Sequence, residues 1–335
     1  MKNYIIIPTY GEFDNLNELL PLLTKYKVII VDDNSLDGTK ELCKRYKNVK
    51  LIVRKGKRGL ASAVVDGILS IKEKDAKVVV MDADFQHDPK KLPEFFSKLN
   101  GCDFVYGNRA GLKMRFYRKI MSKTAAFITK TLVPQLNKIQ DPMSGFFGFK
   151  LSSVNIKNLK PIGYKIMLEI AFNLKENAII DKVNYEFRGR KYGESKLNFK
   201  TILEFILQAF RLNNYRLLIF GLVGLSGIAV NEGVAFLLHP YLPLYAVFII
   251  SAETSIITNF LLNHNLTFKR RAKLTKALPK YNLVALAGLI INVSIALYLS
   301  LFIEYLLANL IGILIAFLFN YILSERFAWK VSDIS

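Results

Sequence analysis

Short apolar runs alternate with segments of helical spacing up to residue 198. Five of the runs predict strands, at residues 4–7, 28–31, 50–53, 78–81 and 104–106. Helix-like spacing occupies residues 16–25 and 40–46, which lie between the first three strands. Strands that are buried on both faces and joined by helices form a largely parallel sheet, as in nucleotide-binding α/β domains. We therefore expect an α/β domain over residues 1–198, with ligands bound beyond the carboxyl ends of its strands.

The second part of the chain has a different pattern, because two long stretches, 217–268 and 281–325, contain no Lys or Arg. A helix needs about 20 mostly apolar residues to cross a bilayer, so each stretch is long enough for two crossings. Four membrane helices are predicted, at residues 217–238, 244–262, 281–303 and 306–323. Residues 215–335 should therefore form a C-terminal all-α membrane domain of four transmembrane helices.

An amphipathic helix is predicted between the two domains, at residues 199–214. Its apolar side chains fall mostly on one helical face: Ile202, Phe205, Ile206, Ala209 and Phe210. Such a helix can lie at the level of the lipid head groups. The alternative is an ordinary amphipathic helix that packs on protein.

The connections between the predicted membrane helices differ in charge. The middle connection carries all the basic residues: Lys269, Arg270, Arg271, Lys273, Lys276 and Lys280. By the positive-inside rule, this connection, both termini and the α/β domain are expected in the cytoplasm. Residues 259–269 resemble residues 320–330, which favours two paired hairpins. Carriers also contain repeated hairpins, so the repeat by itself leaves a transport function open.

Composition adds two constraints. The net charge of +20, from 47 Lys and Arg against 27 Asp and Glu, indicates an anionic partner such as lipid head groups, nucleic acid or phosphate substrates. The two cysteines, Cys43 and Cys102, provide no disulfide framework, which fits a reducing compartment. The first strand ends at Pro8, and this start lacks the long apolar core of a signal peptide.

Candidate metal ligands directly follow the fourth predicted strand. Asp82 and Asp84 are two residues apart, and Gln86 adds a neutral oxygen. Two carboxylates on one turn can converge on Mg²⁺ or Mn²⁺, which keeps open positions for phosphate oxygens. An Asp-x-Asp pair alone is more often a solvated turn, so the interpretation depends on its context.

Polar clusters also follow the first three strands. Pro8, Tyr10 and Glu12 form one, and Asp32 and Asp33 open another, which together suit a base and a ribose. Residues 56–61 resemble a short basic glycine loop that opens a helix, where amides near Lys57 could approach phosphate. This loop lacks the spacing of a P-loop.

These motifs, taken in order, resemble inverting family 2 glycosyltransferases with the GT-A fold, and within them the dolichol-phosphate (polyprenol-phosphate) mannose synthases. The resemblance spans residues 4–197. Its motifs lie at residues 8–12, 31–39, 81–89, 141–147, 163–166 and 190–197. The four-helix tail is similar to the GtrA-like membrane domain that is often fused to these enzymes. The resemblance implies a Rossmann-like GT-A catalytic domain with a mostly parallel sheet, followed by the four membrane helices.

The resemblance also implies roles for individual residues. The nucleotide would be bound by Pro8, Tyr10, Glu12, Asp32, Asp33, Lys57, Asp82 and Ala83. The metal would be held by Asp82, Asp84 and Gln86. The donor diphosphate and acceptor phosphate would be surrounded by Arg109, Arg118, Ser122, Arg190 and Lys196. Asp84, Asp141 and Arg118 are the expected catalytic residues.

The implied partners are GDP-mannose, dolichyl or polyprenyl phosphate and the lipid bilayer, without nucleic acid; the oligomeric state stays open. A phosphate monoester has a second pKa near 6 and is largely a dianion at neutral pH, so it needs little help from a base. Asp141 is therefore expected to position the site rather than to accept a proton.

Three other functions remain as alternatives. A polyprenyl-phosphate glucosyltransferase would use UDP-glucose, and a lipid-linked sugar carrier or flippase would only bind nucleotide. A processive polysaccharide synthase shares the fold, but its acceptor-site Gln-x-x-Arg-Trp is missing. The nearest match, at Gln208 and Arg211, has Leu212 in place of the tryptophan.

Overall fold

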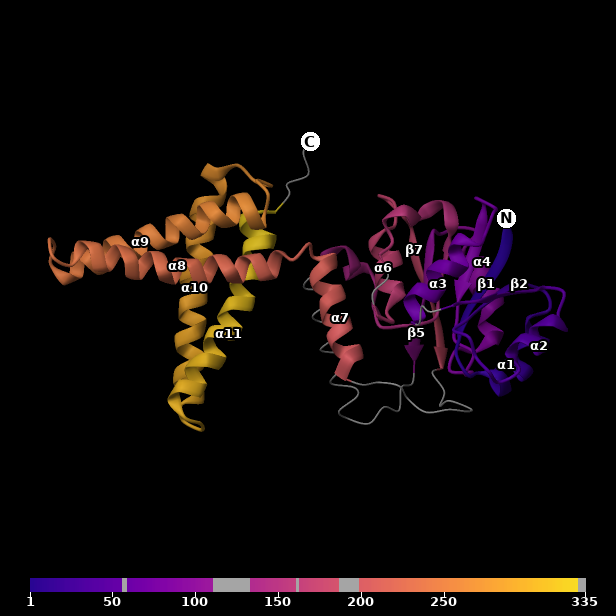
Figure 1. The fold of residues 1–335 in the computed structure, drawn as a ribbon. Coiled ribbons are helices and arrows are strands. Elements are labelled where there is room, and N and C mark those ends of the chain that lie inside the picture. The colour runs from indigo at the N-terminus through magenta and orange to yellow at the C-terminus, as the bar shows by residue number, and fades with distance from the viewer. Residues whose placement is uncertain (56–58, 111–132, 161–162, 187–198, 331–335) are drawn as a thin grey trace. The chain divides into compact units, whose positions relative to one another are not determined.

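The computed structural model describes residues 1–55, 59–110, 133–160, 163–186 and 199–330. Its contacts divide the chain into two compact units, Met1–Leu212 and Asn213–Ser335. Figure 1 shows the sheet and its helices in the first unit and four long helices in the second. The two units are described separately.

A seven-stranded sheet forms the centre of the first unit, in the order β3-β2-β1-β4-β6-β5-β7. The strands are β1 (Lys2–Thr9), β2 (Lys27–Asp32), β3 (Val49–Val53), β4 (Ala76–Val80), β5 (Phe104–Ala110), β6 (Phe147–Lys150) and β7 (Ile180–Glu186). Only β6 runs antiparallel to its neighbours, β4 and β5. The predicted α/β fold with a mostly parallel sheet is therefore confirmed.

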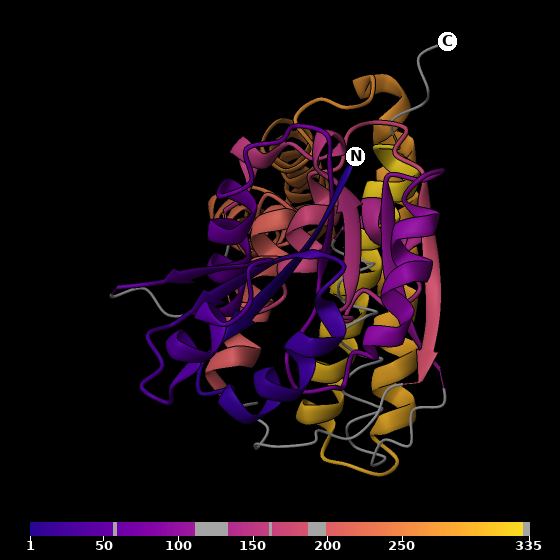
Figure 2. The same cartoon turned by 90° about the vertical axis from the view of Figure 1, so that its right-hand side faces the viewer.

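Helices cover both faces of this sheet, as Figure 2 shows. The helices of the first unit are α1 (Phe13–Leu19), α2 (Thr39–Lys44), α3 (Leu60–Leu69), α4 (Leu92–Lys98), α6 (Ile166–Phe172) and α7 (Phe199–Leu212). A Cβ on Gly67 of α3 would lie 2.8 Å from Ile6 Cγ2, so α3 packs closely on the face to which Ile6 points. Ile5 and Ile7 point to the opposite face because side chains alternate along a strand.

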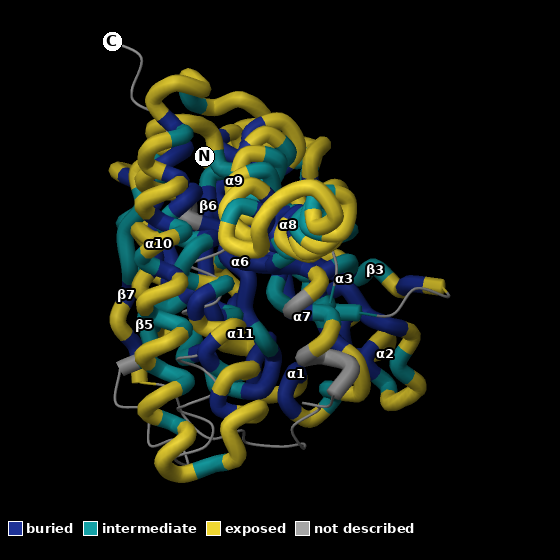
Figure 3. Tube along the Cα trace, turned by 90° about the vertical axis from the view of Figure 1, so that its left-hand side faces the viewer, coloured by how far each residue is buried: buried dark blue, intermediate teal, exposed yellow. Residues whose placement is uncertain are grey.

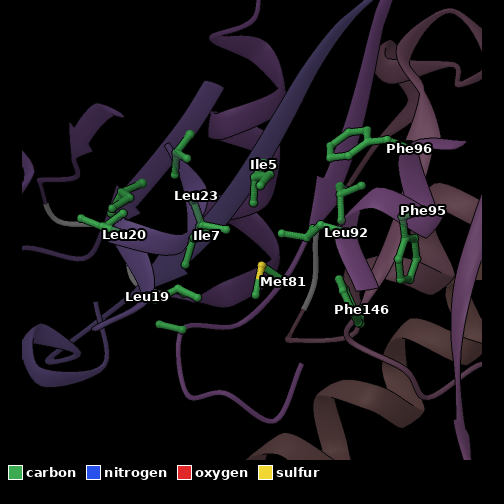
Figure 4. Close-up of a cluster of buried hydrophobic side chains, with 14 of the residues drawn as sticks. Ile5, Ile7, Leu19, Leu20, Leu23, Met81, Leu92, Phe95, Phe96 and Phe146 are labelled. Atoms are coloured by element: carbon green, nitrogen blue, oxygen red, sulfur yellow. The ribbon is translucent and has the colours of Figure 1, made fainter. Parts of the chain in front are cut away.

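The main hydrophobic core lies on that opposite face (Figure 4). There Ile5 and Ile7 pack with Leu19 from α1 and with Phe95 from α4, and all four are fully buried. The segment expected as one helix at 16–25 is divided: α1 ends at Leu19, and a 3-10 turn, Leu20–Leu23, follows with Pro21 in its first turn. Proline lacks the amide that would continue the α-helical hydrogen bonds.

The second unit contains α8 (Arg216–Leu238), α9 (Leu244–Leu262), α10 (Leu274–Leu299) and α11 (Tyr305–Leu323). In the most apolar stretch of each helix, only 11% to 22% of the residues are buried inside the protein. Many residues along these helices are exposed, as the yellow segments of Figure 3 show, and many of the exposed side chains are large and apolar. All four helices are long and apolar enough to cross a membrane. Helix α10 begins earlier than the predicted crossing, so exposed Lys276 and Lys280 lie on its first turns. Lysine can extend its ammonium group from a helix end to the membrane surface.

The two hairpins repeat the same internal packing. Helices α9 and α11 each continue into a π-helical turn, Asn263–Thr267 and Ser324–Ala328. The side chain of Asn259 lies against Gly227 of α8, and Asn320 lies against Gly288 of α10. The chain separations within these two pairs are equal, so the repeat seen in the sequence extends into the preceding helix of each hairpin.

Equivalent aromatic residues of the two hairpins pack against each other. Phe268 and Trp329, which follow the two π-helical turns, stack with ring centroids 4.3 Å apart. Phe260 stacks on Trp329, and its counterpart Tyr321 stacks on Phe268. The aromatic contacts between the hairpins are therefore related by an approximate two-fold symmetry.

Candidate active site

The carboxyl ends of β1, β2, β3 and β4 meet at one edge of the sheet, since these strands are mutually parallel neighbours. Ligands of open α/β sheets bind beyond this edge. Four of the polar clusters singled out in the sequence follow these strand ends. The fold therefore gathers them from distant parts of the chain.

A tight turn after β4, residues 82–86, carries the candidate metal ligands and is named the metal turn for them. Asp84 is buried and accepts a hydrogen bond from the backbone amide of Gln86 at 3.2 Å, while Asp82 and Gln86 are partly exposed. Phe85 between them has a φ of +60°, which is an uncommon backbone conformation for a bulky side chain. Its ring packs against the hydrophobic core, which compensates this strain. The turn is therefore held in a fixed shape at the sheet edge.

His87 supports the same turn from the inside. Its Nδ1 accepts a hydrogen bond from the backbone amide of Asp82 at 2.9 Å, and its ring stacks on Phe146 with centroids 5.0 Å apart. The pKa of His87 is lowered to about 4, mainly by burial; Asp84 opposes this shift, and the charges of Arg109 and Lys165 contribute to it. His87 is thus a neutral, buried acceptor at neutral pH.

A second loop, residues 141–145, lies beside this turn. A Cβ on Gly145 would be 3.1 Å from Cε1 of His87 and 3.5 Å from Oδ2 of Asp82, so the two loops are in close contact. Asp141 in this loop is held by Arg109 of β5 through a bidentate ion pair. Burial alone would lower the pKa of Arg109, but the hydrogen bonds and the charge of Asp141 raise it above its ordinary value. The structure therefore brings Asp82, Arg109 and Asp141 into one site.

Lys165 connects the 141–145 loop to a third segment. Its Nζ donates a hydrogen bond to the carbonyl oxygen of Met143 at 2.7 Å. The pKa of Lys165 is lowered to about 8 by burial and by the charge of Arg109, against the opposing charges of Asp82 and Asp141. Lys165 is thus influenced by the charges of Arg109, Asp82 and Asp141. The side chain of Lys165 can respond to the charge of a bound phosphate.

The predicted nucleotide residues at the ends of β1 and β2 are tied to one another. Asp32 is buried, and its carboxylate accepts hydrogen bonds from Thr9 Oγ1 at 3.1 Å and from Ser35 Oγ at 2.6 Å. Ser35 Oγ in turn accepts from the amide of Gly11 at 2.8 Å. Asp32 therefore orders the turn that follows it and the start of the 10–12 segment.

Asp33 is paired with a cation that the sequence interpretation left without a role. Arg54, directly after β3, makes a buried ion pair with Asp33, and Nη2 of Arg54 donates to the carbonyl oxygen of Gly59 at 2.9 Å. The amide of Gly59 donates to Asp33 Oδ2, also at 2.9 Å. The Asp33–Arg54 pair therefore fixes the position at which α3 begins.

Pro8 is the penultimate residue of β1, and Tyr10 and Glu12 follow the strand. Tyr10 is 44% exposed as a residue, so it is accessible to an aromatic partner. Glu12 accepts a hydrogen bond from Asn15 Nδ2 at 2.6 Å, and Ala83 is buried within the metal turn. The remaining predicted site residues, Lys57, Arg118, Ser122, Arg190 and Lys196, lie outside the described residues.

The sequence interpretation gave no role to His87, Arg54 or Lys165. Signals for them existed: His87 lies inside the metal-turn motif, Arg54 directly follows a strand, and Lys165 belongs to the 163–166 motif. Their partners, however, are backbone atoms or side chains from other loops, which the local pattern does not reveal.

The donor set of the turn fits a hard divalent cation with few protein ligands. In the part of the chain that the structure describes, no three His, Cys, Asp or Glu side chains are grouped to hold a metal by themselves. Two carboxylates and an amide on one turn instead suit Mg²⁺ or Mn²⁺, which take oxygen ligands and commonly share them with substrate phosphates.

Comparisons with known proteins agree with this arrangement. Residues 4–155 match the model of glycosyl transferase family 2, and residues 219–329 match the GtrA/DPMS transmembrane domain. The dolichol-phosphate mannosyltransferase of Pyrococcus furiosus is 38% identical, and the match covers 98% of this chain and 99% of that relative. The Saccharomyces cerevisiae dolichol-phosphate mannosyltransferase is 35% identical, over 61% of this chain and 84% of that protein.

A solved structure of glucosyl-3-phosphoglycerate synthase from Mycobacterium tuberculosis matches 63% of this chain and 78% of its own, with a TM-score of 0.48 and 14% identity. The matched transmembrane domain and the four apolar helices make the chain a membrane protein. One relative matches this chain over nearly the full length of both proteins, and the family 2 domain contains the candidate site. The chain therefore belongs to the dolichol-phosphate mannosyltransferase family of glycosyltransferases.

Proposed function

We propose that the protein transfers mannose from GDP-mannose to dolichyl or polyprenyl phosphate, with inversion at the anomeric carbon and with Mg²⁺ or Mn²⁺ as its cofactor. One observation carries this proposal: the Asp82–Gln86 turn and the Arg109–Asp141 pair converge beside the same sheet edge. They do so in a chain that is related to a dolichol-phosphate mannosyltransferase over 98% of its length.

The donor side of the reaction is assigned to the ends of β1, β2 and β4. The ring of Tyr10 and the carboxylates of Glu12 and Asp33 are suited to a base and a ribose. A divalent cation held by Asp82, Asp84 and Gln86 would neutralise charge on the departing diphosphate. Ala83, Pro8, Asp32 and Lys57 complete the proposed nucleotide-binding residues.

The acceptor needs orientation more than deprotonation. An oxygen of the lipid phosphate, already ionised near neutral pH, forms the new bond to the anomeric carbon of mannose. The bond from this carbon to the diphosphate oxygen breaks, and GDP leaves with the electron pair. Arg109 is proposed to assist through its permanent charge and to hold Asp141 in place. Arg118, Ser122, Arg190 and Lys196 are proposed to surround the phosphates.

The membrane unit is proposed to keep the active site at the surface that holds the lipid acceptor. Basic side chains between α9 and α10, together with those on the first turns of α10, support a cytoplasmic location for this connection, both termini and the catalytic domain. Helix α7 is proposed to lie near the lipid head groups, where its exposed Leu203 would contact the interface.

The proposal is tested with purified protein, GDP-[14C]mannose, a divalent cation and polyprenyl phosphate in detergent. Radiolabel should enter the lipid phase, and its appearance should require the lipid phosphate and stop when a chelator is added. Reconstituted vesicles provide the second arm of the test. If label crosses the vesicle membrane without any mannosylated lipid being formed, the carrier function is correct and the transferase proposal fails.

A further inference from the structure

Helix α7 packs on the first unit through one face. Among its described side chains, Phe205, Gln208, Ala209 and Leu212 are buried, while Leu207 between them is exposed. A buried glutamine on an otherwise apolar face is stabilised by the hydrogen bonds that its polar atoms make within the protein. Among the described residues, Gln208 makes such a bond through Nε2, while its Oε1 has no partner. The polar side chains of this face therefore connect α7 to the rest of the first unit.

Gln208 joins α7 to the active site through Lys165. Its Nε2 donates a hydrogen bond to the carbonyl oxygen of Lys165 at 3.1 Å. The side chain of the same lysine donates to the carbonyl oxygen of Met143 at 2.7 Å, in the loop that contains Asp141. Two consecutive hydrogen bonds thus lead from α7 to the loop that lies against Asp82.

Arg211 provides a second anchor, one helical turn further along α7. It forms an ion pair with Glu169 of α6, whose carboxylate side chain is only 3% exposed. The other carboxylate oxygen of Glu169 accepts the backbone amide of Lys160 at 2.9 Å. Helix α6 begins at Ile166, directly after Lys165. Arg211 therefore fixes the element that follows the lysine, while Gln208 fixes the lysine itself.

The segment before Lys165 is also pressed against α7. Gly163 has a φ of +65°, and a Cβ at this position would lie 3.0 Å from Cβ of Glu204. The carbonyl oxygen of Gly163 accepts the amide of Ala61 at 3.3 Å, in the first turn of α3. A side chain at residue 163 would crowd Glu204 of α7 and strain a left-handed backbone, so this position favours glycine.

We propose that Gln208 and Arg211 are positioning residues of the transferase site, which act through Lys165 and Glu169 on the loop that holds Asp141. Helix α7, whose last residues precede the membrane unit, thereby forms part of the support of the site and not only a tether. The predicted change in kcat rests on the proposed function, whereas the predicted support of the loop by α7 does not.

The test compares Gln208→Ala with Leu207→Ala, which removes a neighbouring but exposed side chain of the same helix. Hydrogen–deuterium exchange of the full-length protein in detergent is measured for peptides that cover residues 141–147, together with kcat and KM for donor and acceptor. Gln208→Ala should increase exchange in these peptides and lower kcat by roughly 10- to 100-fold, because small misplacements at a reacting site have effects of this size. Leu207→Ala should change neither.

Arg211 is tested by a conservative pair. Arg211→Lys keeps a cation beside Glu169 and should recover most of the kcat that Arg211→Ala loses, with similar KM values. If Arg211→Ala does not fold, the Gln208→Ala comparison decides by itself. Equal exchange over residues 141–147 and equal kcat in Gln208→Ala and Leu207→Ala would overturn the proposal. Should the wild-type protein lack mannosyl transfer, the exchange measurement still decides whether α7 supports the loop.

Discussion

Arg109 donates two hydrogen bonds to Asp141, from Nε to Oδ2 at 2.6 Å and from Nη2 to Oδ1 at 2.8 Å. This bidentate geometry uses the planar guanidinium fully and fixes the carboxylate in orientation. Both oxygens of Asp141 are thus occupied by a permanent cation. The arrangement favours a role in which Asp141 holds Arg109 and its own loop in place, as expected for an acceptor that arrives already ionised.

Asp141→Asn should therefore remain appreciably active. The amide keeps one acceptor for Arg109 but loses the second charged hydrogen bond, so we expect kcat to fall by about 10-fold. Asp141→Ala, which removes both acceptors, should lose more. Steady-state kinetics together with donor-binding titrations check this. A complete loss of transfer in Asp141→Asn with donor binding intact would show that the carboxylate is needed as a base.

The metal turn gives a second prediction, with a matched control in the same segment. Asp84→Ala should reduce transfer by at least about 100-fold and remove its dependence on added Mg²⁺ or Mn²⁺, because charge stabilisation at the leaving group is a large catalytic term. Asp88→Ala removes an acid four residues away that caps the Pro89–Lys91 turn by accepting the amide of Lys90. The control should lose about 1 kcal/mol of stability and keep its metal dependence. Equal loss in both variants would argue against a metal at Asp84.

His87 predicts a pH dependence of stability. Burial holds its pKa in the folded protein at about 4, against an ordinary value of 6.5. Between these values the unfolded chain binds a proton that the folded chain does not, so the free energy of unfolding decreases as the pH falls from 6.5 towards 4. The full effect is roughly 3 kcal/mol.

Thermal melts of wild type and His87→Gln in detergent, between pH 7.5 and 4.5, isolate this contribution. The wild type should lose more of its melting temperature over the acidic part of this range than the variant. Parallel curves for the two proteins would mean that His87 is not buried as a neutral acceptor of the Asp82 amide.

The membrane unit offers a prediction that is independent of the transferase site. A Cβ on Gly288 would clash with Oδ1 of Asn320, whereas a Cβ on Gly233 of α8 would have no neighbour within 4 Å among the described residues outside its own stretch of helix. Gly288→Ala should therefore destabilise the protein by about 1–3 kcal/mol through overpacking between α10 and α11. Gly233→Ala should be neutral or slightly stabilising, since alanine favours helix. Equal melting temperatures in detergent for the two variants would contradict the close approach of these helices.

Much of the fold could be predicted from the chain because apolar periodicity is local. All five predicted strands form, and the two strands that were not predicted, β6 and β7, are a four-residue strand and an edge strand with mixed burial. The early start of α10 could not be predicted from apolar content, because its first turns carry lysines whose charged groups remain exposed.

In the candidate site, too, only the features that depend on neighbouring residues in the chain could be predicted. The candidate metal ligands could be singled out from the sequence because they are close together in the chain and directly follow a strand. The partnership of Arg109 with Asp141 and the support of the Asp82 amide by His87 depend on how separate loops pack. Similarly, the spacing of Gln208 and Arg211 invited comparison with an acceptor motif. In the structure both side chains instead turn inward, to Lys165 and Glu169.

The measurement that tests the central claim most directly is a donor panel with one acceptor. Purified protein is incubated with polyprenyl phosphate, a divalent cation and GDP-mannose, UDP-glucose or GDP-glucose at equal concentration, and the lipid products are identified by mass spectrometry and sugar analysis. The account predicts a mannosylated lipid phosphate from GDP-mannose, formed at least about 100-fold faster than any product from UDP-glucose. Preferential formation of glucosylated lipid from UDP-glucose, or no lipid product from any donor, would contradict it.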